Sequence, residues 1–556
     1  MSRFIKKIST LIIVIGLIIT VSACEKKEVN SSLSKPLETW SSSLITKVPT
    51  NAFGLIYWNT KKTAYEKYLT SNWNVNNSKI FKNGLANANP FLKNFLEILQ
   101  KSGYSSEDST WSEIFAENVL FASTESPDDN LYFGLLIKGQ DKRNLEKFIG
   151  ALKQAILEDG SLKLVPFTSQ NPNAFGIELT DEANKSAAKT LYFTWQDDVA
   201  IIASSSKDLD TILTNDKKDL PAILKSEDYK KATKGMPDSK DVFSFIYLDL
   251  NVLKNLVLPS LKHNSIERLA KLPFSVLALA VSMNQELGYD LRCLNNGLPE
   301  SQSQVSSILF QSSMENSLKA TCSNPLVVLS YDGTTIKTVL ESIFSLSELE
   351  TNNIIFESIQ KILTNLKRLS LVGQTAIPMP QTMLVLESPA AEKETEQVKK
   401  VISTLMSATG SPHTWQRTTF DKHQIDYINT SMMGLGIYVY TMGDSLTLVA
   451  SSENIIKSAI LASNVKDFTA NLSKNAKTIY AKDKNVMNLY FDFEEVASVM
   501  EKFGGMIGMF MPNDPKLKEM FEPKELEKIR HFGGFVLSVS VEEDQSIRLK
   551  AAYTKK

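Results

Sequence analysis

Short runs of apolar residues and longer segments with helical spacing alternate along much of the chain. Residues 131–138 are an apolar and aromatic run typical of a strand, and residues 143–157 follow with helical periodicity. Residues 383–386 and 394–407 repeat that order. Because hairpin patterns mix with helices and no regular β-α-β alternation appears, the sequence predicts an α+β fold with mainly antiparallel sheets and flanking helices.

Two segments predict β-hairpins that lead into helices. Asp197 and Asp198 are a tight-turn signal between two strands, which predicts a hairpin over residues 190–203. Residues 436–450, around Gly443, predict a second hairpin. Serine pairs follow both hairpins, and we expect them to cap the next helix.

The two hairpins belong to an internal repeat. Residues 193–205 align without a gap on residues 440–452, and residues 44–60 align on residues 318–334. Further matches in the same order are Thr124 and Pro127 with Thr375 and Pro378, residues 246–250 with 489–493, and residues 276–294 with 536–553. A period of about 250 residues indicates a duplicated domain and not a solenoid.

The repeat sets the predicted domain boundaries. We expect two homologous α+β domains in tandem, residues 44–296 and 318–556, joined by a Ser/Gln-rich linker over residues 297–317. A chain of 556 residues is long enough for two large domains.

The N-terminus carries the most specific motif. Basic residues precede an uncharged apolar run over residues 11–21, which is shorter than the ~20 residues of a membrane-spanning helix. The run ends in Val21-Ser22-Ala23-Cys24, which resembles the lipobox of bacterial lipoproteins. We therefore expect a signal peptide over residues 1–23, a lipidated Cys24 and a polar, flexible tether over residues 24–43. The alternative is an ordinary secretory signal that happens to precede a cysteine.

The resemblance to lipoproteins implies cleavage between Ala23 and Cys24 and attachment of acyl chains to the Cys24 sulfur. Two or three acyl chains anchor a protein stably, so membrane lipid would be the first partner. By the sorting rule of enterobacterial lipoproteins, Glu25 after the cysteine favours the periplasmic face of the outer membrane over the inner membrane.

The mature part resembles a domain-of-unknown-function family of large exported bacterial proteins. Members open with a short Pro-x-x-Ala strand, here residues 49–57, and carry a hairpin that leads into an Ala-Ser-Ser helix start, here residues 192–205. In the second half Pro325 is displaced from the position of Pro49. This family carries no assigned activity, so the resemblance implies none for this chain.

Composition narrows the function classes. The chain has 61 Lys and Arg against 62 Asp and Glu, with no basic stripe, so we expect no nucleic-acid partner. Besides Cys24, only Cys293 and Cys322 are available for a disulfide in an oxidising compartment. Either these two cysteines form a bridge or both are buried free thiols.

The sequence contains no strong metal-binding or nucleophile motif. The four histidines are His263, His413, His423 and His531, and none has the i, i+4 spacing of a metal-binding helix. Ser204 and Lys207 match S-x-x-K, but the repeat has Glu453 and Asn454 there, so a helix cap is the better interpretation.

Two other features leave alternatives open. Asp249 and Asp492 recur after strand-like runs. One interpretation is that they bind a ligand or calcium; the simpler one is that they form strand-end turns or helix caps. The Met-rich residues 503–511 suit core packing, lipid contact or an apolar partner.

These observations predict a membrane-anchored envelope lipoprotein that binds or scaffolds an envelope protein, polymer or lipid. They predict no catalytic residues, no metal and no cofactor. The alternatives are an envelope hydrolase or transferase of unrecognised type, or a carrier of hydrophobic molecules with an apolar cavity under one sheet.

Overall fold

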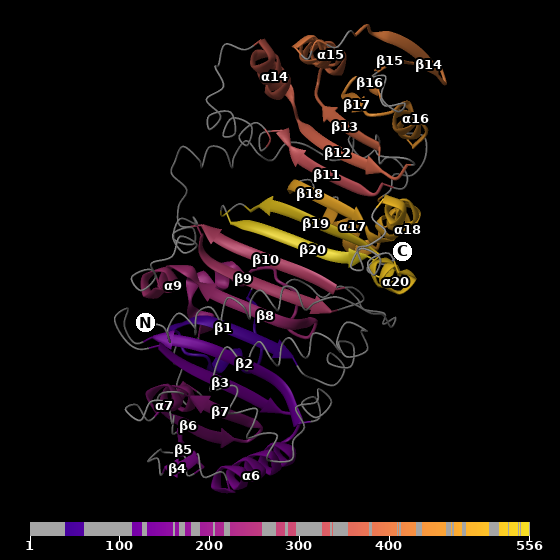
Figure 1. Cartoon of the computed structure of the whole chain (residues 1–556). Coiled ribbons are helices and arrows are strands. Elements are labelled where there is room, and N and C mark those ends of the chain that lie inside the picture. The colour runs from indigo at the N-terminus through magenta and orange to yellow at the C-terminus, as the bar shows by residue number, and fades with distance from the viewer. Residues whose placement is uncertain are drawn as a thin grey trace. The chain divides into compact units, whose positions relative to one another are not determined.

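The computed structural model divides the chain into two compact units, Met1–Gly297 (unit 1) and Leu298–Lys556 (unit 2) (Figure 1). The residues that it describes are 39–59, 114–124, 131–158, 162–165, 173–179, 189–203, 206–215, 223–257, 274–283, 287–295, 325–333, 336, 354–376, 381–408, 410, 413–429, 436–462, 469, 472–480, 485–510, 522–531, 533–542, 544 and 546–554. The predicted signal peptide, residues 1–23, and the predicted linker, residues 297–317, lie outside the described residues.

The described strands of unit 1 pair in antiparallel fashion. They are β1 (Ala52–Asn59), β2 (Phe115–Thr124), β3 (Leu131–Gly139), β4 (Leu162–Val165), β5 (Phe175–Leu179), β6 (Lys189–Gln196), β7 (Val199–Ala203), β8 (Val242–Asp249), β9 (Phe274–Met283) and β10 (Leu287–Asn295). Their order across the sheet is β4-β5-β6-β7-β3-β2-β1-β8-β9-β10.

Unit 2 has the same strand order, strand for strand. Its strands are β11 (Val327–Asp332), β12 (Arg368–Gln374), β13 (Gln381–Glu387), β14 (Gln416–Phe420), β15 (His423–Asn429), β16 (Gly436–Met442), β17 (Leu446–Ala450), β18 (Asn485–Asp492), β19 (Gly534–Val541) and β20 (Ile547–Thr554). They follow one another as β14-β15-β16-β17-β13-β12-β11-β18-β19-β20, again antiparallel. The predicted α+β fold with mainly antiparallel strands is confirmed.

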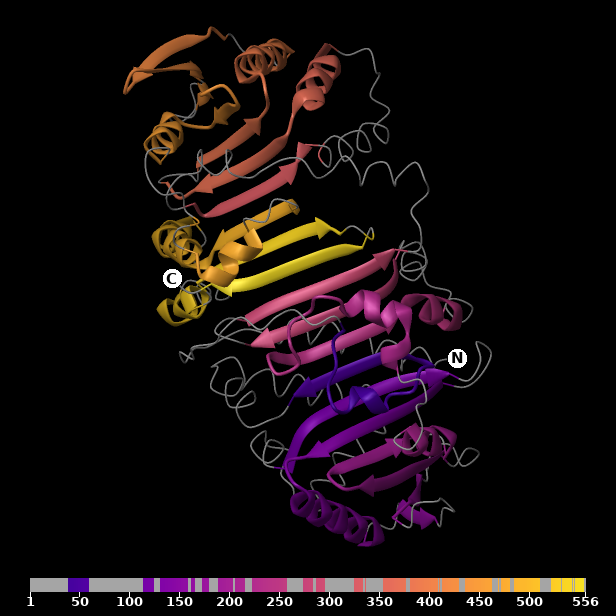
Figure 2. The same cartoon turned by 180° about the vertical axis from the view of Figure 1, so that it is seen from behind.

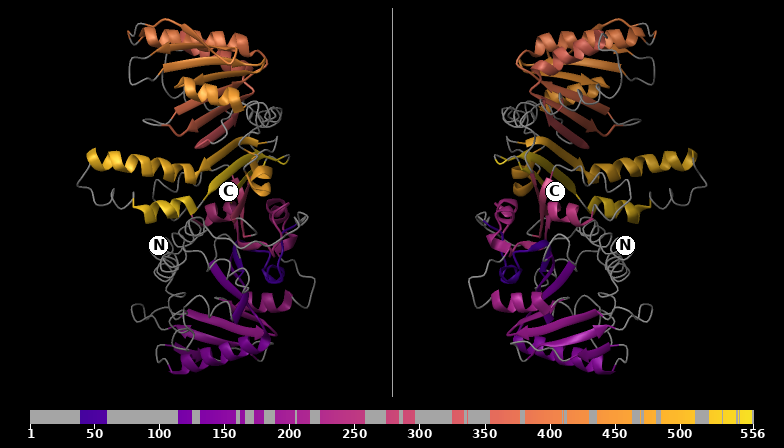
Figure 3. Two further views of the ribbon diagram at one scale, coloured as in Figure 1. Left: turned by 90° about the vertical axis from the view of Figure 1, so that its right-hand side faces the viewer. Right: turned by 90° about the vertical axis from the view of Figure 1, so that its left-hand side faces the viewer.

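The helices also follow corresponding strands in the two units. Unit 1 has η1 (Ile45–Lys47), α6 (Lys142–Glu158), α7 (Ser206–Asn215), η2 (Ile223–Lys225), α8 (Glu227–Thr233) and α9 (Leu250–Val257). Unit 2 has α14 (Ile354–Asn365), α15 (Ala391–Ala408), α16 (Glu453–Ala462), α17 (Lys474–Tyr480), α18 (Phe493–Phe510) and α20 (Pro523–His531). Figure 3 shows α18 and α20 side by side, extending away from the strands of unit 2.

Helices cover both faces of each sheet, because successive strand side chains point to opposite faces. In unit 1, α7 and α8 pack on one face and α6 packs on the other. In unit 2, α16 and α17 pack on the face that corresponds to that of α7 and α8, and α14 and α15 pack on the opposite face (Figure 2). We call the face of α7, α8, α16 and α17 the first face and the other the second face.

The strand registers correct the sequence alignment of the repeat by one residue. Leu55 of β1 lies opposite Tyr247 of β8, and Val328 of β11 lies opposite the matching Tyr490 of β18. Leu55 therefore corresponds to Val328, and the gapless match of Leu55 with Leu329 is wrong. A slip of one residue would place the side chain on the opposite face of the sheet.

The predicted tether, residues 24–43, is wrong at its C-terminal end. Residues 24–38 lie outside the described residues, but Trp40 is fully buried in the core of the first face of unit 1. Its ring stacks on Phe245 with 4.0 Å between the ring centroids. The polar composition of the segment predicts a tether, whereas one large aromatic residue is enough to dock its end.

Candidate functional site

Of the three cysteines, only Cys293 lies within the described residues. Cys293 is buried on β10, and burial raises the pKa of its thiol to about 11. Cys24 and Cys322 lie outside the described part of the chain, so lipidation and the Cys293–Cys322 bridge stay predictions.

Asp249 and Asp492 are helix caps, as the simpler of the two interpretations predicts. Oδ1 of Asp249 accepts hydrogen bonds from the amides of Asn251 and Val252 at 2.9 and 3.1 Å, at the start of α9. Oδ1 of Asp492 accepts from the first amides of α18 in the same way, at 3.0 and 3.1 Å. Within the described ranges, no three His, Cys, Asp or Glu side chains form a group that could hold a metal ion.

The histidines are not brought together. His413 precedes β14 and His423 opens β15, so they lie at opposite ends of the β14–β15 hairpin. Nδ1 of His423 is 2.8 Å from the hydroxyl oxygen of Tyr440. His531 is the last residue of α20, and His263 falls outside the described residues.

The serines after the second hairpin differ from the prediction. Oγ of Ser451 accepts a hydrogen bond from the amide of Thr382 at 2.9 Å, so Ser451 ties the end of β17 to β13 and does not act as the expected cap of α16. Glu453 forms an ion pair with Lys457 at 3.1 Å on the same helix. Ser204 lies outside the described residues.

The most developed polar site lies on the β14–β15 hairpin of unit 2. Phe420 and His423 are cross-strand partners, and Asp421 and Lys422 between them both have positive φ, 45° and 69°. A two-residue turn with positive φ at both positions is the tight type that matches strand twist. Among the described strands β14 pairs with β15 alone, so it is an edge strand.

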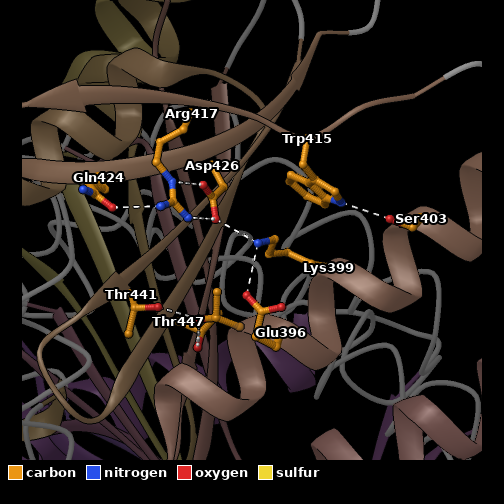
Figure 4. Close-up of polar contacts among 10 residues, drawn as sticks. Glu396, Lys399, Ser403, Trp415, Arg417, Gln424, Asp426, Thr441 and Thr447 are labelled. Carbon is orange, nitrogen blue, oxygen red and sulfur yellow. Dashed lines mark hydrogen bonds and ion pairs between the residues drawn. The ribbon is translucent and has the colours of Figure 1, made fainter.

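A network of paired charges fastens this hairpin to α15 (Figure 4). Nε and Nη2 of Arg417 donate to the two carboxylate oxygens of Asp426 at 2.7 and 3.3 Å. Nη1 of Arg417 donates to Gln424 at 3.0 Å. Nζ of Lys399, on α15, donates to Asp426 at 2.9 Å and to Glu396 at 3.1 Å. Asp426 therefore joins the strand pair to the helix.

Trp415 completes the contact between hairpin and helix. Its indole Nε1 donates to Oγ of Ser403 at 2.9 Å, and Nζ of Lys399 lies 5.4 Å from its ring centroid. Unit 1 has a related contact, in which Nζ of Lys153 on α6 lies 4.6 Å from the ring centroids of both Phe175 and Trp195. Both units thus place a helix lysine against aromatic rings, which belong to Trp415 just before β14 and to Phe175 and Trp195 on β5 and β6.

The electrostatics of the network favour a fixed surface over acid–base chemistry. Burial opposes the ionisation of Asp426, but hydrogen bonds from Arg417 and Lys399 outweigh it and hold the pKa of Asp426 below its ordinary value. Burial likewise opposes the charge on Lys399, and its bonds to Asp426 and Glu396 raise the pKa of Lys399. Groups held in their charged forms are poor proton donors or acceptors near neutral pH.

One buried carboxyl stands apart from this network. Glu394 on α15 is 2% exposed, and burial raises its pKa. Three residues after the first residue of the corresponding helix α6, the structure has Leu145, a core residue. Glu394 therefore occupies a position that belongs to the core in unit 1.

We predict that Asp426→Asn loosens the hairpin and lowers the free energy of unfolding of unit 2 by about 1–3 kcal/mol, because it removes charge-assisted hydrogen bonds. The pKa of Asp426 is lowered in the fold, so its stabilising contribution is present above about pH 4 and is lost as the pH falls through the lower folded pKa. Urea unfolding between pH 3 and pH 7 measures both effects. Equal pH profiles for Asp426→Asn and the parent would contradict the prediction.

Comparison with known proteins gives a weak structural likeness alone. No protein-family model and no curated protein matches it. Two solved structures match, both of TP0453: crystal form III, with 12% identity and a TM-score of 0.23 over 42% of this chain and 77% of that chain, and crystal form IV, with 10% identity and a TM-score of 0.25 over 50% and 87%. At these TM-scores the likeness carries no argument about function.

Proposed function

We propose that this chain is a lipid-anchored lipoprotein of the cell envelope that binds or scaffolds a partner. The observation that carries the binding role is the β14–β15 hairpin, an exposed edge held rigid by paired charges. Trp and Arg are among the residues that most often dominate binding interfaces, and here Arg417 lies on β14 and Trp415 lies just before it. An envelope protein or polymer is the partner class that this surface suits.

Two homologous domains in tandem are part of the proposal. The shared strand order supports duplication, and so does a pair of opposed charges at corresponding positions. Glu117 lies opposite Lys138 in unit 1, and Arg368 lies opposite Glu387 in unit 2, with the signs exchanged. The two units therefore keep opposite charges at these corresponding positions, although the residues themselves differ.

Anchoring through Cys24 is the second part of the proposal, with the periplasmic face of the outer membrane favoured by Glu25. Among the described helices, none combines the length and apolar character that a membrane crossing requires. What supports the anchor is the lipobox-like Val21-Ser22-Ala23-Cys24.

We predict that Cys24→Ala abolishes metabolic labelling by palmitate and moves the protein from the membrane to the soluble fraction. Acyl chains contribute about 0.8 kcal/mol per buried methylene, so their loss removes stable attachment. Cys293→Ala is the matched control, since Cys293 is a buried thiol in the fold, and it should keep label and membrane attachment. A labelled or membrane-bound Cys24→Ala protein would refute the anchor.

The binding role is tested by crosslinking in intact cells and affinity purification. We expect a stoichiometric partner with the parent chain, and much lower recovery with Arg417→Glu. Lys422→Glu, at the exposed turn of the same hairpin, is the control for added negative charge and should retain the partner. Recovery of the parent protein alone would overturn the proposal.

A further inference from the structure

A continuous row of aliphatic side chains crosses the second face of the unit 2 sheet. Each member lies directly opposite the next on the neighbouring strand, so all of them share one face. In order from β17 to β20 the row is Val449, Leu384, Leu371, Leu329, Leu489, Leu537 and Ala551. We call these residues the leucine row.

Unit 1 has the same row, but there most of its members are buried. The corresponding residues, from β7 to β10, are Ile202, Leu135, Leu120, Ile56, Ile246, Leu279 and Leu291. Leu135 is 7% exposed in unit 1, whereas its counterpart Leu384 is 39% exposed in unit 2, and the adjacent Leu371 is 36% exposed. Leu384 and Leu371 are thus open to water in unit 2, whereas the position of Leu384 is core in unit 1.

The chemistry of the surrounding face restricts what can cover the row. The parallel row on one side is Leu386, Leu369, Tyr331, Met487, Val539 and Leu549. The row on the other side is Thr382, Gly373, Val327, Phe491, Phe535 and Tyr553. None of the residues in the three rows is charged. A charged ligand, or a peptide with unpaired backbone groups, would be desolvated here without compensation.

The exposed area of the leucine row also restricts what can bind to it. Two leucines exposed by about two-fifths, among half-buried neighbours, correspond to an apolar patch of roughly 300–600 Å² at most. A stable protein interface needs about 800 Å² from each partner, so a second copy of the chain would be held poorly. From Leu384 to Leu537 the row crosses four strand spacings, roughly 19 Å. Because the leucine row is long, narrow and uncharged, it suits one extended hydrocarbon chain.

We propose that the leucine row binds the acyl chain of a lipid. This inference goes beyond the proposed function, because it depends on neither Cys24 nor the β14–β15 hairpin. The acyl chain would lie across β13, β12, β11, β18 and β19 and give Leu371 and Leu384 the cover that their counterparts have in unit 1.

The test is titration of a fluorescent palmitate analogue into the full chain carrying Cys24→Ala, which has no acyl chain of its own. We expect saturable binding at one site, and a tenfold or greater loss of affinity in the double variant Leu371→Gln/Leu384→Gln. The control is Leu405→Gln/Leu461→Gln, which changes two leucines that are 47% and 53% exposed on α15 and α16, outside the row. It should bind like the parent.

A second variant guards against loss of folding. Leu384→Trp keeps the leucine row apolar but fills the space above it, so it should also weaken binding. Circular dichroism checks that this variant is folded. Absence of saturable binding by the parent, or equal losses in row and control variants, would overturn the inference. The inference would also be overturned if the parent protein sedimented as a dimer and the variant Leu371→Gln/Leu384→Gln as a monomer. The leucine row would then be a self-association surface. Since every protein tested lacks Cys24, these outcomes are independent of the anchor.

Discussion

Replacing Trp40 by alanine is expected to lower the free energy of unfolding of unit 1 by about 3–5 kcal/mol, the usual loss for a fully buried aromatic residue. Trp40 is 0% exposed, stacks on Phe245 and meets Tyr57 edge-on with 5.1 Å between ring centroids. Domains are stable by only about 5–15 kcal/mol, so this single change removes a large share of the margin.

The backbone of Trp40 is fixed as firmly as its ring. The amide of Trp40 donates to Oγ1 of Thr233 at 3.3 Å, and the hydroxyl of Tyr229 donates to the carbonyl oxygen of Trp40 at 3.1 Å. Burial keeps the pKa of Tyr229 far above its ordinary value, so the hydroxyl remains a donor at physiological pH. The segment before β1 therefore attaches where α8 and the sheet meet.

Urea unfolding followed by far-UV circular dichroism measures the effect, with hydrogen exchange assigning it to unit 1. The matched control is Trp415→Ala in unit 2, where the ring is only partly buried and the loss should be smaller. A chain that starts at Thr39 should keep the stability of the parent, and one that starts at Ser43 should lose as much as Trp40→Ala. If both truncated chains unfold like the parent, Trp40 does not hold this segment to the core of unit 1.

The strands and hairpins could be predicted because their signals are local. Apolar runs and turn residues lie close together in sequence, and the hairpin expected around Asp197 is β6–β7. Asp197 has a φ of 53°, which an aspartate tolerates better than most residues. The helices expected at 143–157 and 394–407 are α6 and α15.

Register was harder to predict, because it depends on turn length and not on composition. In unit 1 Gln196 pairs with Val199 across a two-residue turn, whereas in unit 2 Met442 pairs with Leu446 across a three-residue turn. The gapless alignment of the hairpins therefore matches Thr194 with a residue one position too far along β16. The period of two along a strand makes such an error reverse the faces.

The charged hairpin site could not be predicted, because it joins residues from three elements. Lys399 comes from a helix, and Arg417 and Asp426 come from two strands. One local signal was available: a two-residue turn at Asp421 and Lys422 places residues 417 and 426 opposite each other. The position of Lys399 on α15 depends on tertiary packing, which sequence periodicity does not predict.

The second large effect is expected at Arg368, whose side chain is fully buried in unit 2. We predict that Arg368→Ala lowers the free energy of unfolding of unit 2 by about 3–5 kcal/mol, the loss seen when one partner of a buried charge pair is removed. Arg368 lies opposite Glu387 on β13 and opposite Asp332 on β11, and both carboxyls are at most 5% exposed. Without the guanidinium they are two buried acids with less compensation.

Hydrogen bonds to the guanidinium add to this loss. Nη1 of Arg368 donates to Oγ of Ser330 and Nη2 donates to the carbonyl oxygen of Asn485, both at 3.3 Å. Ser330 in turn is hydrogen-bonded to Ser370 at 2.9 Å, so the polar cluster spans three strands. Removing one member leaves buried polar groups unpaired, which costs more than the net gain of any one bond.

Unit 1 supplies the matched comparison, because residues of opposite charge face each other at the corresponding positions with the signs exchanged. There Glu117 lies opposite Lys138, and Asn59 takes the place of Asp332. Oγ of Ser43 bridges that pair, donating to Glu117 at 3.5 Å and accepting from Lys138 at 3.1 Å. The triple variant Arg368→Glu, Glu387→Lys, Asp332→Asn copies this pattern into unit 2.

We expect the triple variant to recover most of the stability that Arg368→Ala loses, as measured by urea unfolding at pH 7. Recovery would show that the fold requires opposite charges at these two positions and tolerates either orientation, which is what a duplicated scaffold would retain while its residues diverge. A triple variant as unstable as Arg368→Ala would mean that the guanidinium geometry matters and not the charge pair. The exchange of signs between the units would then not reflect a common arrangement.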